Sequence, residues 1–214
     1  MEISTVLFDL DGTITDSGSG IINSVKYALK KAGRKIPPED ELRKFIGPPL
    51  QEQFMKCCGI EEKEAAEMVA LYREYYQEEG IFDNRVYDGV MEMLKTLKEA
   101  GLKIVMATSK PEKFAKMIAE HFDLIGGACM DGARTKKQEV IQYVLEQCKE
   151  KDREKIRMVG DRCYDIEGAN REGIRAIGVL YGYGSKEELE EAGADGLAET
   201  PEEVVRMILN GMHP

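Results

Sequence analysis

The sequence is poor in the residues that hold zinc or build disulfide frameworks. It has five cysteines, an odd number with no Cys-x-x-Cys pair, and only two histidines, His121 and His213. This scarcity argues against a zinc site and against disulfides. Free cysteines are commonly buried and inert, so we expect these five to be small packing residues: Cys57, Cys58, Cys129, Cys148 and Cys163.

Long apolar runs and an excess of positive charge are also missing. No stretch approaches the roughly 20 apolar residues of a membrane-spanning helix, and the first residues lack the basic-then-apolar pattern of a secretion signal. Lysine and arginine number 30 against 40 aspartates and glutamates, which gives a formal net charge of -10. Nucleic acids and anionic membranes require a basic surface, so neither is an expected partner. With 43% hydrophobic residues in 214, we expect a cytoplasmic globular protein with a proper core.

What the sequence does contain is an unusual junction near its start. An apolar run over residues 3–8 ends abruptly in Asp9, Asp11 and Gly12. Side chains alternate along a strand, so both aspartates would point the same way at the end of a buried strand. Two like charges about 4 Å apart repel by roughly 4 kcal/mol in an effective dielectric near 20. The pair therefore predicts a metal ion or a shared proton, whereas the simpler interpretation is an Asx turn before Gly12.

The hydrophobic pattern divides the chain into a helical block and a region where helices and strands alternate. Residues 15–82 have helical spacing, broken at Pro37-Pro38 and at Gly47-Pro48-Pro49. The later strands are predicted at 102–107, 124–129, 156–160 and 175–180, and the later helices at 111–121, 136–149, 165–172 and from Thr200 onward. This alternation predicts an α/β, Rossmann-like parallel sheet with helices on both faces. The expected domains are a core, 1–14 and 83–214, and a helical cap, 15–82, inserted after the first strand.

Polar side chains follow three of the predicted strands. Ligands bind at the carboxyl ends of strands in open parallel sheets, so these side chains are expected to converge. They are Asp9 and Asp11, then Thr108, Ser109 and Lys110, and finally Asp161 and Asp165. Four carboxylates offer only oxygen ligands, which favour Mg²⁺ over softer metals. A hydroxyl from Thr108 and an ammonium from Lys136 or Lys137 would supply what a phosphoryl group needs during transfer.

These motifs resemble those of the haloacid-dehalogenase-superfamily phosphatases. The resemblance rests on four motifs in order across nearly the whole chain: Asp9-x-Asp11-Gly12-Thr13, Thr108, a later lysine, and Gly160-Asp161-x-x-x-Asp165. Residues 160–169 and 181–189 are similar to the phosphoglycolate phosphatase-like branch, which includes bacterial 5'-nucleotidase-like members and carries a helical cap. The family often has Lys-Pro-x-Pro at the lysine, where this chain has Lys136-Lys137-Gln138-Glu139; we prefer Lys137.

The resemblance implies a role for each matched residue. Asp9 would be the nucleophile that forms an aspartyl-phosphate, and Asp11 the general acid and base. Mg²⁺ would be held by Asp9, the backbone carbonyl of Asp11 and Asp161, with Asp165 in the same shell or orienting the waters of the ion. Thr108 and the lysine would hold the phosphoryl oxygens. Further candidates for substrate contact are Gly12, Thr13, Ser109, Lys110 and Gly47, although Lys110 is equally well a solvated lysine and the aromatic residues beside Gly47, Phe45 and Phe54, are more typical of a core.

The sequence thus predicts a Mg²⁺-dependent phosphatase of small phosphomonoesters, with phosphoglycolate and nucleoside 5'-monophosphates as leading substrates. A phosphomutase and a pyrophosphatase on the same scaffold are the alternatives. A receiver-type signalling module shares the acidic cluster, threonine and lysine but is shorter and lacks the helical insert. The presence of Asp11 disfavours a true dehalogenase, because that reaction needs no second carboxylate to protonate a leaving alcohol.

Overall fold

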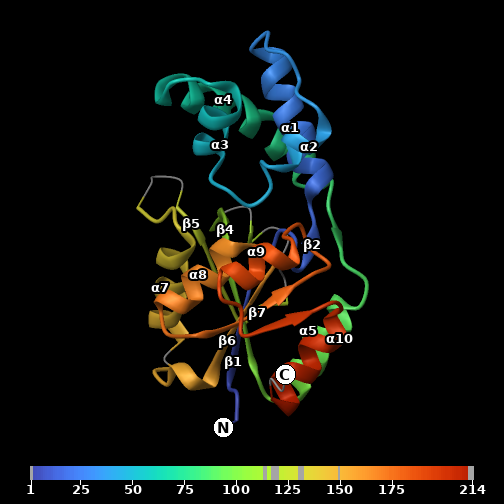
Figure 1. The fold of residues 1–214 in the computed structure, drawn as a ribbon, viewed down its shortest axis with the longest axis vertical. Coiled ribbons are helices and arrows are strands. Elements are labelled where there is room, and N and C mark those ends of the chain that lie inside the picture. Colours follow the sequence, from blue (N-terminus) through green and yellow to red (C-terminus); the bar gives the residue numbers. More distant parts are fainter. Residues whose placement is uncertain (1, 113–114, 117–120, 130–132, 149, 212–214) are drawn as a thin grey trace. The chain divides into compact units, whose positions relative to one another are not determined.

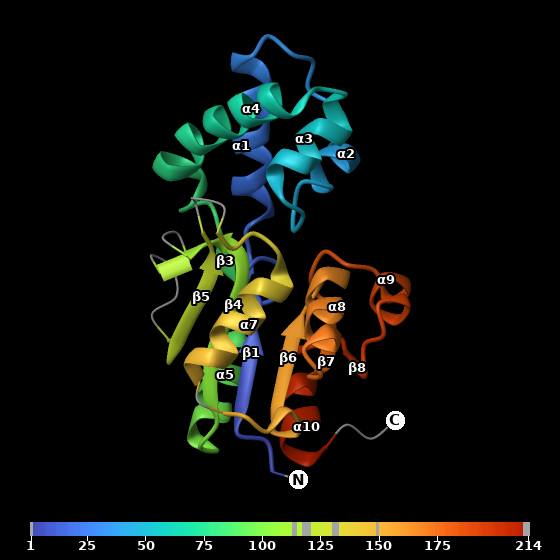
Figure 2. The same ribbon diagram turned by 90° about the vertical axis from the view of Figure 1, so that its left-hand side faces the viewer.

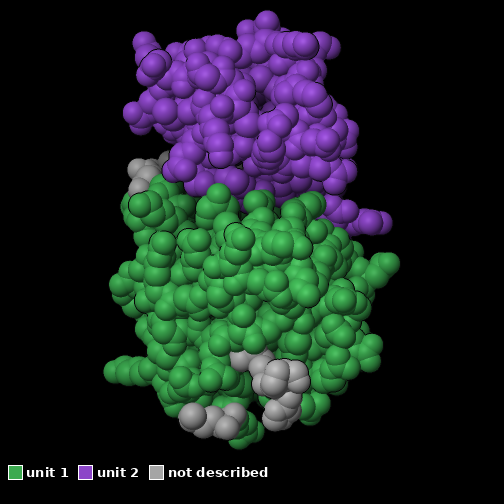
Figure 3. Space-filling model, in the orientation of Figure 1, with its two compact units in different colours: residues 1–15, 86–214 green, residues 16–85 purple. Residues whose placement is uncertain are grey.

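The computed structural model describes residues 2–112, 115–116, 121–129, 133–148 and 150–211. The chain forms two compact units, which Figure 3 colours separately. The core unit consists of residues 1–15 and 86–214, and the inserted unit of residues 16–85. The chain passes from one unit to the other at two short strands that pair with each other, β2 (Thr15–Asp16) and β3 (Arg85–Val86). Both crossings lie slightly later in the chain than the sequence boundaries after residues 14 and 82.

A six-stranded sheet in the order β5-β4-β1-β6-β7-β8 forms the centre of the core unit (Figure 1). Every neighbouring pair is parallel. Its strands are β1 (Thr5–Phe8), β4 (Lys103–Pro111), β5 (Leu124–Ala128), β6 (Ile156–Gly160), β7 (Arg175–Val179) and β8 (Gly196–Ala198). Phe8, the last residue of β1, lies beside Met106 on one neighbour and Val159 on the other. The residues that follow these three therefore emerge at the same edge of the sheet.

Helices cover both faces of this sheet (Figure 2). Alternation along β1 feeds two separate cores, because Val6 and Phe8 belong to one apolar cluster and Leu7 to the other. The first cluster includes buried residues of α5 (Val90–Glu99) and α10 (Pro201–Asn210). The second includes α7 (Lys137–Cys148), α8 (Cys163–Arg171) and α9 (Lys186–Glu191). The predicted α/β fold is confirmed.

The inserted unit is helical. It contains α1 (Gly18–Lys31), α2 (Glu39–Arg43), α3 (Leu50–Cys58) and α4 (Glu62–Tyr75), which continues into a π-helical turn, η1 (Tyr76–Gly80). Phe45 and Phe54 are buried and meet edge to face at 4.9 Å, so they are core residues of this unit. The chain leaves the helical state at the predicted breaks, where the prolines interrupt the backbone hydrogen bonds.

Several boundaries differ from the sequence prediction. Strand β4 continues past residue 107 to Pro111, with a register shift against β5 after Ala107. Helix α8 starts at Cys163 rather than 165, and β8 has only three residues, too few for a periodic signal. The helix predicted over 111–121 lies largely outside the described residues. Within the described part of the chain, no helix has the length and apolar character required to traverse a bilayer.

Candidate active site

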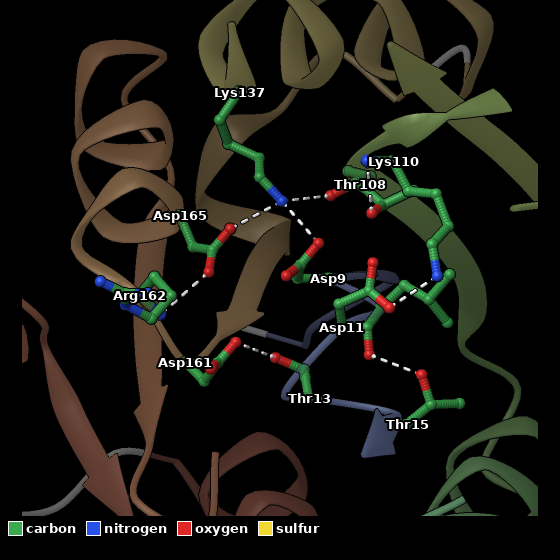
Figure 4. Close-up of polar contacts among 12 residues, drawn as sticks. Asp9, Asp11, Thr13, Thr15, Thr108, Lys110, Lys137, Asp161, Arg162 and Asp165 are labelled. Atoms are coloured by element: carbon green, nitrogen blue, oxygen red, sulfur yellow. Dashed lines mark hydrogen bonds and ion pairs between the residues drawn. The ribbon is translucent and has the colours of Figure 1, made fainter. Parts of the chain in front are cut away.

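The predicted polar residues meet at the carboxyl edge of the three central strands. Asp9 follows β1, Thr108 lies in β4, and Asp161 follows β6 (Figure 4). The backbone N–H of Asp9 donates to the carbonyl of Val159 at 2.9 Å, which extends the β1–β6 pairing to Asp9. The regular pairing of the strands therefore fixes the backbone positions from which these side chains extend.

Three carboxylates form a buried cluster at this edge. Asp9, Asp161 and Asp165 are exposed by 7%, 0% and 1%, and one oxygen of each lies within 4.8 Å of the others. Lys137, the first residue of α7, places its ammonium 2.6 Å from Asp9 Oδ1, 2.7 Å from Asp165 Oδ1 and 2.9 Å from the carbonyl of Ala107. The Lys137 ammonium thus pairs with two of the three carboxylates. The cluster is short of positive charge, as expected of a site that takes a cation.

The pKa values follow from burial and from the charges within the cluster. Burial raises the pKa of Asp9 to about 6, although Lys137 acts in the opposite direction. Burial and the neighbouring Asp165 and Asp9 carboxylates hold the pKa of Asp161 well above its usual range. Burial alone would lower the pKa of Lys137, but the carboxylates of Asp165 and Asp9 raise it, so this ammonium stays charged. The cluster therefore combines a permanent cation with carboxylates that bind protons unusually well.

Asp161 is held from both sides. The Thr13 hydroxyl donates to its Oδ1 at 3.1 Å, and the backbone N–H of Tyr183 donates to its Oδ2 at 2.9 Å. Glycines make this close approach possible: a Cβ at Gly182 would lie 2.3 Å from Asp161 Cβ, and one at Gly184 would lie 2.0 Å from its carbonyl oxygen. Gly12, with a φ of 95°, has the same relation to the carboxylate, since a Cβ there would lie 2.1 Å from Oδ2.

Sequence reasoning missed this support for Asp161. The 181–184 segment, Tyr-Gly-Tyr-Gly, entered only as part of the family resemblance, although two glycines flanking an extended turn are a signal of close backbone approach. The first tyrosine of the segment also contacts the loop after β1, because the hydroxyl of Tyr181 donates to the Thr13 carbonyl at 3.2 Å; its ring contacts Tyr87.

Asp11 lies apart from the carboxylate cluster. Its Oδ1 accepts from the ammonium of Lys110 at 2.7 Å, across 99 residues of sequence. The Lys110 side chain is 4% exposed and that of Asp11 13%. The interpretation of Lys110 as a solvated surface lysine is therefore wrong. Its backbone N–H also donates to the Thr108 hydroxyl oxygen at 3.1 Å, which links both residues of β4 to the site.

The remaining candidates are divided between the site and other places. Lys136 is exposed and its backbone N–H is bonded to Glu139, so Lys137 is the lysine that reaches the aspartates. Ser109 is half-buried in β4 between Thr108 and Lys110. Gly47 belongs to the inserted unit, with a φ of 102°.

Comparisons with known proteins place this geometry in context. The family model described as haloacid dehalogenase-like hydrolase matches residues 6–179. A 5'-nucleotidase of Pseudomonas aeruginosa is 44% identical over 190 residues, covering 86% of each chain. The tyrosine-protein kinase PtkA of Mycobacterium tuberculosis is 38% identical over 185 residues, 84% of this chain but only 62% of that protein. The crystal structure of a predicted phosphatase from Clostridium acetobutylicum superposes with a TM-score of 0.93 at 42% identity, covering 98% of this chain and 100% of the other.

Proposed function

Because the chain belongs to the haloacid dehalogenase-like hydrolases, we propose that it is a Mg²⁺-dependent phosphatase that hydrolyses small phosphomonoesters through an aspartyl-phosphate. The observation that carries this proposal is the buried cluster of Asp9, Asp161 and Asp165, in which the Lys137 ammonium pairs with Asp9 and Asp165. These four residues belong to three of the four motifs that resemble those of the family, and Thr108 is the fourth. In this proposal the inserted unit is the cap.

The residues present suit a magnesium ion. Three carboxylates gather their oxygens within 4.8 Å with a single lysine among them, and oxygen is the ligand that Mg²⁺ prefers. Asp9, Asp161 and the backbone carbonyl of Asp11 would hold the ion, with Asp165 beside them. When bound, the ion supplies positive charge that screens the carboxylates from an incoming phosphate.

Asp9 acts as the nucleophile in this proposal. Its carboxylate oxygen attacks phosphorus, and the bond from phosphorus to the ester oxygen breaks. With a pKa of about 6, Asp9 is ionised at neutral pH and able to attack. Lys137 holds Asp9 through Oδ1 at 2.6 Å, which fixes the rotation of the carboxyl group and leaves Oδ2 for the phosphorus.

Asp11 serves both halves of the reaction. It gives a proton to the leaving ester oxygen. It later takes a proton from the water that attacks phosphorus, and the bond between the Asp9 oxygen and phosphorus breaks, which frees Asp9 and releases phosphate. Its separation from the buried carboxylate cluster suits a group that must exchange protons. Thr108 contributes a hydrogen bond: its oxygen already accepts from the Lys110 backbone, so its own hydrogen is left to donate to a phosphoryl oxygen.

The substrate class follows from the relatives rather than from the cluster. A 5'-nucleotidase at 44% identity supports nucleoside 5'-monophosphates, and the resemblance to the phosphoglycolate phosphatase-like branch supports phosphoglycolate. The test is phosphate release from phosphoglycolate, AMP, IMP, GMP and pyrophosphate at equal concentration, with Mg²⁺ or with EDTA. We expect hydrolysis of at least one monoester in Mg²⁺ and none in EDTA. No release from any monoester in Mg²⁺ would reject the proposal, and preferential cleavage of pyrophosphate would favour the pyrophosphatase alternative.

The glycines that approach Asp161 closely, Gly12, Gly182 and Gly184, give a prediction that can be measured without substrate. In Gly182→Ala, the new Cβ overlaps Asp161 and the Gly12 carbonyl, so the carboxylate must shift. We expect Mg²⁺ affinity, measured by calorimetry, to fall by about 10-fold or more, the size typical of lost support around a metal ligand. Tyr183→Phe is the matched control, because it keeps the backbone N–H that binds Asp161. Unchanged affinity in Gly182→Ala would show that Asp161 does not bind the ion.

A further inference from the structure

The ion pair between Lys110 and Asp11 joins two segments that the sequence treats separately. The ammonium lies 2.7 Å from Asp11 Oδ1, which is the distance of a strong charge-assisted hydrogen bond. Figure 4 shows Lys110 reaching from β4 toward Asp11, away from the carboxylates around Lys137. The two lysines therefore bind different aspartates: Lys137 binds Asp9 and Asp165, and Lys110 binds Asp11.

The backbone of β4 determines where Lys110 begins. The register of β4 against β5 shifts between Ala107 and Pro111, and Lys110 lies within that shifted stretch. There its N–H binds the Thr108 hydroxyl, and its side chain is 4% exposed. A buried lysine side chain loses much of its rotational freedom, so Lys110 holds its ammonium in one position beside Asp11.

Burial makes the partner important. A lysine this deeply buried without a carboxylate would be strongly destabilising, and Asp11 is the carboxylate it contacts. The contact occupies Oδ1 of Asp11 and leaves Oδ2 for a proton. It also fixes the plane of the carboxyl group, which decides whether Oδ2 can reach a leaving oxygen.

We infer, on the basis of the proposed phosphatase function, that Lys110 is a positioning residue that holds the Asp11 carboxyl group in the orientation for proton transfer. It acts through Asp11 and not by binding the phosphoryl group. This replaces the expectation that Lys110 is a substrate-binding residue.

Leaving groups of different basicity separate the two roles. Glycerol phosphate releases a poor leaving group that needs a proton, whereas p-nitrophenyl phosphate releases one that does not. In Lys110→Met we expect kcat/KM for glycerol phosphate to fall about 30-fold or more, a large part of the roughly 10²-fold to 10⁴-fold that general acid–base catalysis typically contributes. For p-nitrophenyl phosphate kcat/KM should change by less than about twofold. Equal losses with both substrates would overturn the inference, because a phosphate-binding lysine serves both.

Two further variants sharpen the result. Lys110→Gln keeps a hydrogen-bond donor and should recover part of the loss with glycerol phosphate. In an Asp11→Asn background, Lys110→Met should add almost nothing, because the group through which it acts is already gone. Independent, multiplying losses would contradict the inference. Lys98→Met, an exposed lysine of the same unit that pairs with Asp123 at 3.6 Å, is the control and should behave as wild type.

Unfolding measurements keep this inference separate from the proposed function. Urea midpoints of wild type, both single variants and the double variant report the ion pair without any substrate. We expect the double variant to unfold at a higher midpoint than Lys110→Met, since it does not leave the Asp11 carboxylate without its partner. Additive midpoints would overturn the positioning role. A coupled pair in a protein that hydrolyses no phosphomonoester would instead reject the function and retain the pair.

Discussion

Replacing Asp9 with asparagine is expected to abolish phosphatase turnover. Asparagine has nearly the same shape, so the site should keep its outline, but the amide cannot attack phosphorus. Loss of a nucleophile typically costs about 10⁴-fold to 10⁶-fold in kcat. Asp9 also contacts Lys137 at 2.6 Å and belongs to the carboxylate cluster, so the change weakens cation binding as well. Phosphate release, followed for hours at high enzyme concentration, measures the residual rate.

The control for this variant is Asp88→Asn, which makes the same chemical change at an exposed position of the core unit. It should hydrolyse at the wild-type rate. Mass spectrometry adds a second measurement: wild type quenched in acid during turnover should carry a phosphoryl group on Asp9, and Asp9→Asn should carry none. A variant that kept the wild-type rate would mean that the nucleophile is another residue.

Removing the buried ammonium should cause the second large loss. In Lys137→Met, the side-chain volume is nearly conserved, but Asp9 and Asp165 lose the charge that lies 2.6 and 2.7 Å from them. Breaking a buried ion pair from one side costs about 3–5 kcal/mol of folding stability. We expect a loss of that size in urea unfolding with EDTA present. Turnover should fall by about 10³-fold, the effect of losing a transition-state contact to a charged group.

Magnesium should restore part of the stability but little of the turnover. The ion supplies positive charge to the same carboxylates, so adding it should raise the unfolding midpoint of Lys137→Met more than that of wild type. Lys136→Met is the matched control: this neighbouring lysine is exposed, and its loss should change neither property. Equal stability of Lys137→Met and wild type in EDTA would contradict this prediction. It would mean that the carboxylates are protonated in the folded protein and do not need the ammonium of Lys137.

The parts of the fold that were predictable are those with a local signal. The run ending at Asp9 and the alternation of helices and strands gave a parallel sheet and the edge where functional residues gather. Three-residue β8 and the paired β2 and β3 have too few residues for any period to show. The family resemblance placed the lysine within two positions, and burial of Lys137 beside Asp9 is what distinguishes it from Lys136.

The partners of each side chain were much less predictable. Thr13 and Lys110 were expected to contact substrate, yet Thr13 donates to Asp161 and Lys110 to Asp11. The two pairs are separated by 148 and 99 residues in the sequence. No local pattern encodes such a choice, because it depends on the register of β4 beside β1 and on the backbone path of the turn after β1.

The pairing of β2 with β3 has a consequence for how the insertion is tolerated. The strand that enters the inserted unit pairs with the strand that leaves it, so the 70 residues of this unit form a loop whose two ends are held together. The entropic cost of closing a loop grows only logarithmically with its length, so the length of the inserted segment has little effect on the stability of the sheet. Insertions of different length can therefore be accommodated between β2 and β3 without disturbing β1, the strand that precedes Asp9.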